Sequence, residues 1–387
     1  MTTPRPARAL LTEFALTAGL MAACLALLAP RPQTGGEDLA QDYLSARALL
    51  AGEDPYQPLQ PLRDRMGIPA GARFRMKAEY NPHPPAALIL TLPFAGLSFE
   101  HAYRVFRVVQ VLGLAAAWVW ACRRNGAGSS ATIVVGGAAL GLWPPVWGGL
   151  DWGQPVGVLA LLAVALWELA GTRQTGAARA GAAGMVFALS CLVRPLFAGV
   201  AAAAGAWPVR RLAMAVAGAV GVVLGSFLIV GITPREWHHR AARAGEFADA
   251  GGSIPAVLGL PAAAGVAGFV LWIGTIAVLA RRGLPAREAA GFGLAGGLLW
   301  YPLAWFHYDV VLIPVAVWAA AEGVRRGHRP ALLAVAGYIG LRFVPPYASI
   351  PGSMTWFPVA GRLCLVLACA MLAISRSDRD SPVTSVK

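Results

Sequence analysis

Two carboxylates near the start of the chain, Asp38 and Asp42, stand where they could take part in a reaction. Their four-residue spacing places both on one face of a helix, and a carboxylate within hydrogen-bond reach of a hydroxyl can accept its proton. The other interpretation is that Asp38 caps the helix, since Asp is favoured at a helix start. The residue types leave both interpretations open, and they do not choose which carboxylate would be the base.

The segment that carries these carboxylates, residues 37–52, has the pattern of an amphipathic helix. Its apolar stripe recurs at helical spacing and consists of Leu39, Tyr43, Ala46 and Leu50. Gly52 favours a helix end, and Asp54-Pro55-Tyr56 favours a turn. We therefore predict a helix of about 14 residues that lies in a membrane interface.

The long polar segment that contains this helix ends at Tyr80-Asn81-Pro82-His83-Pro84-Pro85. Its prolines stiffen the chain and hold the preceding residues extended. His83 could contact a substrate here. The alternative is that a histidine at a helix start is simply solvated.

A short glycine-rich and aromatic turn is predicted at Trp147–Pro155. Its tryptophans could be interfacial anchors. Asp151 and Gln154 are better candidates for polar contacts with a ligand, because little else in such a turn would require them.

Arg194, followed by Pro195, interrupts an apolar run near the predicted outer face. An arginine at membrane depth is costly unless it is paired or faces water, and its guanidinium suits a phosphate held by two hydrogen bonds. A second aromatic turn, Trp300–Asp309, contains His307 and a carboxylate. Three polar residues near the last outer turn fit packing better than ligand contact: Tyr338, Arg342 and Tyr347.

The composition predicts what surrounds these residues. Of the 387 residues, 57% are hydrophobic and only 13% are charged, whereas a soluble domain is about 25% charged. Apolar stretches follow one another along the whole chain. This excludes a disordered chain, a fibrous repeat, a disulfide scaffold and a soluble enzyme with a single anchor. The sequence predicts an all-α polytopic membrane protein.

A crossing helix needs about 20 apolar residues, and fewer when it is broken or enclosed by protein. The chain therefore predicts about 12 crossings with both termini inside. The first segment lacks a suitable cleavage site, so we expect a retained helix and not a signal peptide. The predicted segments are 10–29, 102–121, 131–147, 154–170, 180–193, 196–209, 212–232, 264–280, 287–301, 308–322, 331–343 and 356–374.

In this topology residues 1–375 form one integral membrane domain, followed by a short cytoplasmic tail at 376–387. The long polar loops 30–84 and 233–263 lie outside. The apolar segment 85–97 contains a proline and is short for a crossing. We expect it to be a half-helix that enters from the outside and lines a cavity, because non-spanning backbone at lipid depth needs protein or water around it.

The few charges are unevenly distributed. Basic residues number 32 against 19 acidic ones, and many form pairs at the ends of apolar segments: Arg123-Arg124, Arg210-Arg211, Arg281-Arg282 and Arg325-Arg326. Such pairs are typical of cytoplasmic loops, so no nucleic acid partner is expected. Most acidic residues fall in outer loops, which predicts chemistry on the outer side. The five cysteines lack metal-ligand spacing, and no metal or other cofactor is expected.

Five features, in order along the chain, resemble glycosyltransferase family 87. The first two are Asp38-Leu39-x-x-x-Tyr43-x-x-Ala46-x-x-Leu49-x-x-Gly52-x-Asp54-Pro55-Tyr56 and Tyr80-x-x-x-Pro84-Pro85. The other three are Gly153-Gln154 at a helix start, the step Arg194-Pro195, and Pro302-x-x-Trp305-x-His307-Tyr308. The resemblance runs from about residue 9 to residue 320, and the last quarter of the chain is too generic to align.

Members of this family look like enzymes of the GT-C fold that transfer mannose or a similar hexose from a polyprenyl-phosphate carrier. The resemblance implies a GT-C-like bundle of transmembrane helices in the bacterial cytoplasmic (inner) membrane. It implies a polyprenyl-phosphate sugar as donor, a glycan or glycolipid as acceptor, and membrane lipids as surroundings.

The resemblance places the essential aspartate at Asp38. Asp42 stands where an aromatic residue is commoner, and Arg194 replaces a more usual lysine with its charge kept. An alcohol that attacks an anomeric carbon needs a base, and a departing phosphate needs a cation. The implied contacts with substrate or phosphate are Arg194, His307, Gln154, Asp151, Tyr80, His83 and Tyr308.

Two other functions fit parts of the sequence. A transporter or flippase of a lipid-linked sugar usually shows internal repeats and charges near the membrane midplane, and neither is evident here. A scaffold of an envelope-assembly complex with a decayed site is the third interpretation. The large acidic outer loop favours an enzyme.

Overall fold

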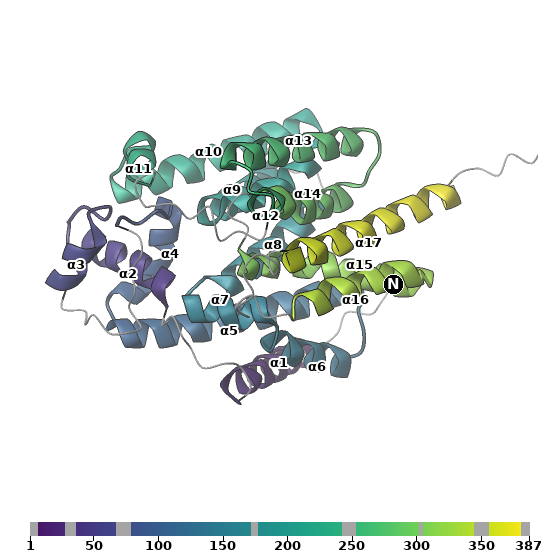
Figure 1. The fold of residues 1–387 in the computed structure, drawn as a ribbon, viewed down its shortest axis with the longest axis horizontal. Helices are drawn as coiled ribbons and strands as arrows, with labels where there is room; N and C mark the ends of the chain where they lie inside the picture. The colour runs from purple at the N-terminus through teal and green to yellow at the C-terminus, as the bar shows by residue number, and fades with distance from the viewer. Residues whose placement is uncertain are drawn as a thin grey trace, which may run out of the picture.

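The computed structural model describes residues 7–27, 36–66, 79–171, 177–241, 253–301, 305–343 and 356–380. Every regular element in these ranges is a helix (Figure 1), which agrees with the predicted all-α class. Tyr347, Pro302 and parts of the predicted outer loops and of the predicted cytoplasmic tail lie outside the described residues.

The elements are α1 (Ala7–Leu27), α2 (Glu37–Leu50), α3 (Leu59–Arg65), α4 (Pro85–Ala95), α5 (Phe99–Asn125), α6 (Ser130–Gly141), α7 (Pro144–Trp152), α8 (Val156–Gly171), α9 (Ala177–Val193), the 3-10 helix η1 (Pro195–Ala206), α10 (Val209–Val230), α11 (Pro234–Ala241), α12 (Ile254–Val257), α13 (Ala262–Arg281), α14 (Ala286–Trp300), the 3-10 helix η3 (Phe306–Leu312), α15 (Ile313–Arg326), α16 (Arg329–Leu341) and α17 (Trp356–Asp380).

Six helical segments in the described part of the chain are long and apolar enough to cross a membrane. They are α1, α5, α10, α13, the segment His307–Arg326 and the segment Trp356–Ser375. The pair α6 and α7, bent by 50°, gives a seventh candidate. The chain is therefore a multi-pass membrane protein. Twelve crossings are not shown, because α8, α9, η1, α14 and α16 are all shorter than these spans.

Two predicted elements differ from the structure around residue 144. The predicted helix at 131–147 is broken, since α6 ends at Gly141 and α7 begins at Pro144. Proline cannot continue the hydrogen bonds of the preceding helical turn, and the sequence has two prolines in a row here. The predicted turn at 147–155 is wrong over most of its length, because α7 continues to Trp152.

The segment after Arg194 is a 3-10 helix, η1, and not the α-helix expected there. A 3-10 helix rises about 2.0 Å per residue against 1.5 Å for an α-helix, so η1 covers more distance with the same residues. It lies directly on α14: a Cβ added to Gly199 would be 2.4 Å from the carbonyl oxygen of Gly293. These two glycines let the backbones of η1 and α14 touch.

The apolar core runs through α5, α8, α14 and α15. Trp167 of α8 is fully buried in it and packs against Trp318 of α15, with ring centroids 5.8 Å apart. In contrast, α10 and α13 expose large apolar side chains such as Leu228 and Leu271. Exposed apolar faces on long helices are what a lipid environment requires.

The polar first loop folds into α2 and α3, which gather with α4 and α11 at one end of the molecule (Figure 1). The predicted amphipathic helix is formed by α2, but its polar face is buried as well as its apolar stripe, including Gln41 and Ser45. Of the predicted stripe, Leu50 is instead 62% exposed. The helix is covered on both faces because its polar residues meet other polar groups. The short helix α4 has the length predicted for the half-helix and packs against α2.

Several arginines of the predicted inner loops bind helix residues. Arg123 pairs with Glu13 of α1, and Arg124 lies 2.7 Å from Glu168 of α8. Arg287 of α14 reaches the same glutamate at 3.2 Å. These pairs tie helices that are distant in sequence to one another.

Candidate active site

The start of α2 is fixed by a glycine. Gly36 is the N-cap residue, with a φ of 85°, and its N–H donates to the carbonyl oxygen of Asp151 at 2.9 Å. A Cβ at Gly36 would lie 2.7 Å from the ring of Tyr103, so no other residue fits there without a shift. Asp38 is therefore not the N-cap residue, which counts against the capping interpretation.

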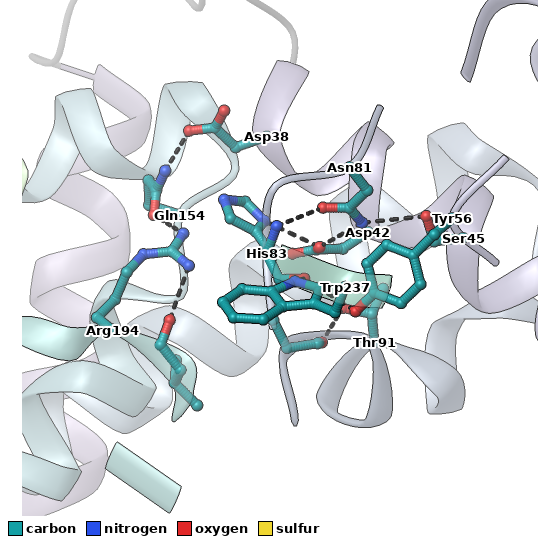
Figure 2. A network of polar contacts seen from close by, with 12 residues as sticks. Asp38, Asp42, Ser45, Tyr56, Asn81, His83, Thr91, Gln154, Arg194 and Trp237 are labelled. Carbon is teal, nitrogen blue, oxygen red and sulfur yellow. Dashed lines mark hydrogen bonds and ion pairs between the residues drawn. The ribbon is translucent and has the colours of Figure 1, made fainter. Parts of the chain in front are cut away.

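Asp42 takes part in a buried hydrogen-bond network (Figure 2). Asn81 Nδ2 donates to Asp42 Oδ1 at 3.0 Å and to Ser45 Oγ at 3.0 Å. His83 Nδ1 lies 2.9 Å from the same Asp42 oxygen, and the His83 N–H donates to Asn81 Oδ1 at 2.9 Å. Asn81 thus joins the polar face of α2 to the proline-rich segment before α4.

Two donors from other elements hold the backbone of His83. The Tyr56 hydroxyl donates to the His83 carbonyl oxygen at 2.9 Å, and Trp237 Nε1 of α11 donates to it at 3.1 Å. Figure 2 shows the His83 ring between Asp42 and the side chains of Gln154 and Arg194. The segment after α10, through α11, therefore helps to position a residue of the segment between α3 and α4.

Asp38 is linked to Arg194 through one amide (Figure 2). Gln154 Nε2 donates to Asp38 Oδ2, and Arg194 Nη2 donates to Gln154 Oε1 at 2.6 Å. Asp38 is partly buried, whereas Gln154 is 3% exposed. A carboxylate and a guanidinium from distant parts of the chain thus stand on the two sides of one side-chain amide.

Arg194 occupies the predicted break between two helices. Its backbone is extended, with a φ of −151°, between α9 and η1. The side chain is 4% exposed and Nη1 donates to the carbonyl oxygen of Val193 at 2.9 Å. Its Cζ lies 5.9 Å from the centroid of the Tyr308 ring, which brings η3 to the same place.

The two carboxylates of α2 have opposite pKa shifts. Burial raises the pKa of Asp38 and outweighs the nearby charges of His83 and Arg194 and the bond from Gln154; the charge of Asp42 adds to the rise. Burial also acts to raise the pKa of Asp42, but the charge and hydrogen bond of His83 outweigh it and the pKa is lowered. Asp42 is thereby held ionised, while Asp38 binds a proton more readily.

Three other predicted site residues lie in surroundings that differ from those of the α2 carboxylates and Arg194. His307 is 1% exposed and packs between aromatic rings, with its centroid 4.6 Å from Tyr308 and 6.0 Å from Trp305. Asp151 contributes its carbonyl oxygen to the start of α2. Tyr80 is partly buried beside Asn81 and, among the described residues, takes no part in the hydrogen bonds of this network.

Some polar residues in and around the site were missed by the sequence reasoning. Asn81 and Ser45 are fully buried partners of the Asp42 network. Asn81 has a signal in retrospect, since an Asn-Pro step opens the proline-rich segment. Arg362 also has one, because a lone arginine inside an apolar helix is costly unless it is paired.

Arg362 belongs to a second charged cluster. Its Nε donates to Asp309 Oδ1 at 2.7 Å, and its other nitrogens donate to the carbonyl oxygens of Leu298 and Trp305 at 3.1 and 3.2 Å. Arg342 pairs with the other oxygen of Asp309. Asp309 and Arg362 are both 0% exposed. The cluster fixes the backbone on either side of His307 and Tyr308.

The arrangement around α2 can accept a proton at Asp38 and bind an anion at Arg194. In the described part of the chain no group of three or more His, Cys, Asp or Glu residues is placed to hold a metal ion. Acid–base and charge–charge interactions are the chemistry that these side chains offer.

Comparisons with known proteins show which solved structures and which protein family this chain is similar to. Two crystal structures of ArnT from Cupriavidus metallidurans are similar to this chain, one bound to undecaprenyl phosphate and one in the apo state. They are 16% and 15% identical to this chain with TM-scores of 0.47 and 0.46, and the alignments cover 97% and 95% of this chain and 79% and 78% of theirs. No curated protein matches.

The family model that matches is Glycosyltransferase family 87, over residues 81–346. The matched range contains Asn81, His83, Gln154 and Arg194 and begins after α2, so it is narrower at the N-terminal side than the resemblance seen in the sequence. It covers well over half of the chain. The chain therefore belongs to glycosyltransferase family 87.

Proposed function

We propose that this membrane glycosyltransferase transfers a hexose, with mannose as the first candidate, from a polyprenyl-phosphate donor. The acceptor is a glycan or glycolipid on the outer side of the bacterial cytoplasmic membrane. The observation that carries the proposal is the connection of Asp38 to Arg194 through Gln154. It sets a proton acceptor beside a cation, which are the two groups that such a transfer needs.

In the proposed reaction an acceptor hydroxyl oxygen bonds to the anomeric carbon of the donor sugar. The bond from that carbon to the phosphate oxygen breaks, and polyprenyl phosphate leaves with the electron pair. Asp38 takes the hydroxyl proton. Arg194, with Tyr308 beside it, stabilises the negative charge that develops on the phosphate.

Asp38 is the better base of the two carboxylates. Asp42 already accepts hydrogen bonds from His83 and Asn81, and its lowered pKa makes it a weak proton acceptor. Asp38 has the raised pKa that favours proton uptake. We assign Asp42 the role of orienting His83, whose ring then contacts the sugar or the phosphate.

The architecture that we propose is the GT-C-like bundle of about 12 crossings. The shorter apolar helices α8, α9, η1 and α16 support it, because helices enclosed by protein can cross with fewer apolar residues. In this arrangement residues 1–375 form one membrane domain, and α2, α3, α4 and α11 lie at its outer face, where the lipid chain of the donor reaches the site from the bilayer.

The test is a transfer assay with purified protein in detergent, radiolabelled polyprenyl-phosphate mannose and a glycolipid acceptor. Wild type should form labelled product. Asp38→Asn should lower kcat about 100- to 10,000-fold, since it removes the base, and should leave donor binding nearly unchanged. Asp64→Asn is the matched control, because Asp64 is an exposed residue of the same loop whose carboxylate binds the adjacent Arg63.

Asp38→Asn with full activity would contradict the assignment of the base. Wild-type protein that binds the donor without forming product, but moves it across vesicle membranes, would favour the transporter or flippase instead. A detergent assay separates the two, because transport requires two compartments and transfer does not. Other labelled polyprenyl-phosphate hexoses in the same assay identify the sugar.

A further inference from the structure

Gln154 stands between the two oppositely charged groups of the site. One end of its amide donates to Asp38 and the other accepts from Arg194. A neutral amide has a donor and an acceptor, so it satisfies a carboxylate and a guanidinium at the same time. Its backbone is fixed as well, because its N–H donates to the Gly149 carbonyl oxygen at 2.8 Å and Pro155 follows.

We propose that Gln154 is a positioning residue that keeps Asp38 and Arg194 from forming a direct ion pair. The proposal rests on the proposed function, in which these two residues are the base and the phosphate-binding cation. A carboxylate in contact with a guanidinium loses basicity. A guanidinium whose donors are occupied by a carboxylate has fewer left for a phosphate. The amide separates them and preserves both properties.

The two groups could meet if the amide were absent. Each is bonded to the same amide, so only one side-chain group lies between them. Arginine has a long flexible stem, and its guanidinium matches a carboxylate with two parallel hydrogen bonds. Asp38 lies at the start of α2, partly buried. Shortening residue 154 therefore opens a path to a direct pair.

Other ionisable groups around Asp38 come from several elements. The charge of Asp42, also on α2, raises the pKa of Asp38, while His83 and Arg194 lower it. Glu37 precedes Asp38 on α2 and is buried. Tyr308 of η3 interacts electrostatically with Asp38, and Tyr103 of α5 and Asp151 of α7 lie at the start of α2 beside Gly36. None of these is altered by a substitution at Gln154, so a change in the titration of Asp38 reports on Arg194 and on the amide.

The direction in which the pKa of Asp38 changes distinguishes two roles of Gln154, a separator of two charges and a hydrogen-bond donor alone. If Gln154 only donates a hydrogen bond, its removal raises the pKa of Asp38, because the ionised form loses a donor. If Gln154 separates two charges, its truncation lowers the pKa, because Arg194 moves onto the carboxylate. Gln154→Ala opens the gap, and Gln154→Met fills it without hydrogen bonds.

The experiment is the labelling of Asp38 by a hydrophobic carbodiimide, which reacts with protonated carboxyl groups, measured by mass spectrometry over a pH series. In Gln154→Ala the midpoint should fall by about one pH unit or more, and in Gln154→Met it should rise. The exposed Asp64 in the same samples is the internal control, and the extent of its labelling should be the same in all variants. A midpoint that rises or stays the same in Gln154→Ala overturns the proposal.

A second measurement covers the case in which Gln154→Ala does not fold. Asp38→Asn keeps the shape of the side chain, and its affinity for undecaprenyl phosphate can be compared with that of wild type. If Gln154 already separates the charges, the affinity should change by no more than about threefold, which is under 1 kcal/mol. A larger increase would show that Asp38 neutralises Arg194 in the wild type, and the proposal would fail.

The labelling experiment needs no substrate, so its outcome does not depend on which sugar is transferred. Wild-type protein that fails to transfer any hexose overturns the proposed function but leaves the labelling result to be judged by itself. Conversely, an active enzyme whose Gln154→Ala variant shows a raised midpoint keeps the proposed function and loses this inference.

Discussion

Two clusters in the described part of the chain, around Asp38 and around Asp309, bring a buried arginine close to an aspartate that is distant in sequence, and they are built differently. Asp309 is paired directly with Arg342 and Arg362, and carbonyl oxygens take further donors of Arg362. Asp38, in contrast, reaches Arg194 only through Gln154 and stays partly exposed. One cluster is closed and fully buried, whereas the other is open at its carboxylate.

The difference shows how one pair of residue types serves two purposes. A buried ion pair must be completely bonded, because the cost of removing charges from water is offset only by good geometry and further hydrogen bonds. A site that handles protons and anions needs the opposite, since a fully paired carboxylate is a poor base and a fully paired guanidinium binds anions weakly. We therefore interpret the Asp309 cluster as structural.

The largest expected effect is on folding. Asp309→Asn leaves two arginines buried without their carboxylate, which should cost about 3–5 kcal/mol. The folded yield should fall sharply, and the midpoint of thermal unfolding in detergent should drop, as followed by tryptophan fluorescence. Asp38→Asn serves as the control and should unfold close to wild type. Equal midpoints for Asp309→Asn and wild type would remove the distinction between the clusters.

The next effect concerns the cation of the open cluster. Arg194→Met removes the positive charge that we propose stabilises the departing phosphate, and kcat should fall about 100- to 1,000-fold. Arg194→Lys keeps the charge but loses the planar fork, so it should stay within about tenfold of wild type. Steady-state transfer rates test both variants. If lysine were no better than methionine, geometry and not charge would be the essential property.

A smaller effect concerns pH. Asp38 must be ionised to accept a proton, and burial raises its pKa above the ordinary 3.8. The rate should therefore increase as pH rises through that raised pKa. His83→Gln removes a charge that lowers the pKa of Asp38, so the acid limb of kcat/KM should move to higher pH by about one unit. If the acid limb of kcat/KM does not move, the charge of His83 does not influence the base.

The smallest effect concerns the link between α11 and the proline-rich segment before α4. Trp237→Phe removes one of two donors to the His83 carbonyl oxygen, at a cost of about 1 kcal/mol. We expect about a fivefold loss in kcat/KM and little change in thermal unfolding. Adding Tyr56→Phe removes the second donor and should deepen the loss. A double variant as active as wild type would show that His83 needs no such support.

The positions of the helices could be predicted well because their signal is local. Apolar periodicity located α1, α5 and α13 to within a few residues. The failures have local physical reasons too. Two adjacent prolines break the segment into α6 and α7, and close contact with α14 accompanies the 3-10 form of η1. About twelve crossings were predicted from the apolar segments of the sequence, but an apolar segment does not by itself fix the length of its helix.

The candidate site was predicted in its parts and not in its connections. The residue types marked Asp38, Gln154 and Arg194 as separate candidates, and the structure brings them into one chain of hydrogen bonds. The Asn-Pro step is only a weak signal for Asn81, because such steps are common in loops, and the residue was missed. Its importance appears only when α2 lies beside it.

The sequence by itself determined that this chain crosses a membrane, because the burial of apolar residues depends on composition and local order. It also marked the few charged residues as candidates for a site, because a charge inside a membrane is costly. Only the tertiary structure decided which charges meet. Asp38 and Gln154 are 116 residues apart, and Asp309 and Arg362 are 53 apart. Contacts over such separations depend on how helices pack, and packing decided which aspartate is closed in an ion pair and which stays open for chemistry.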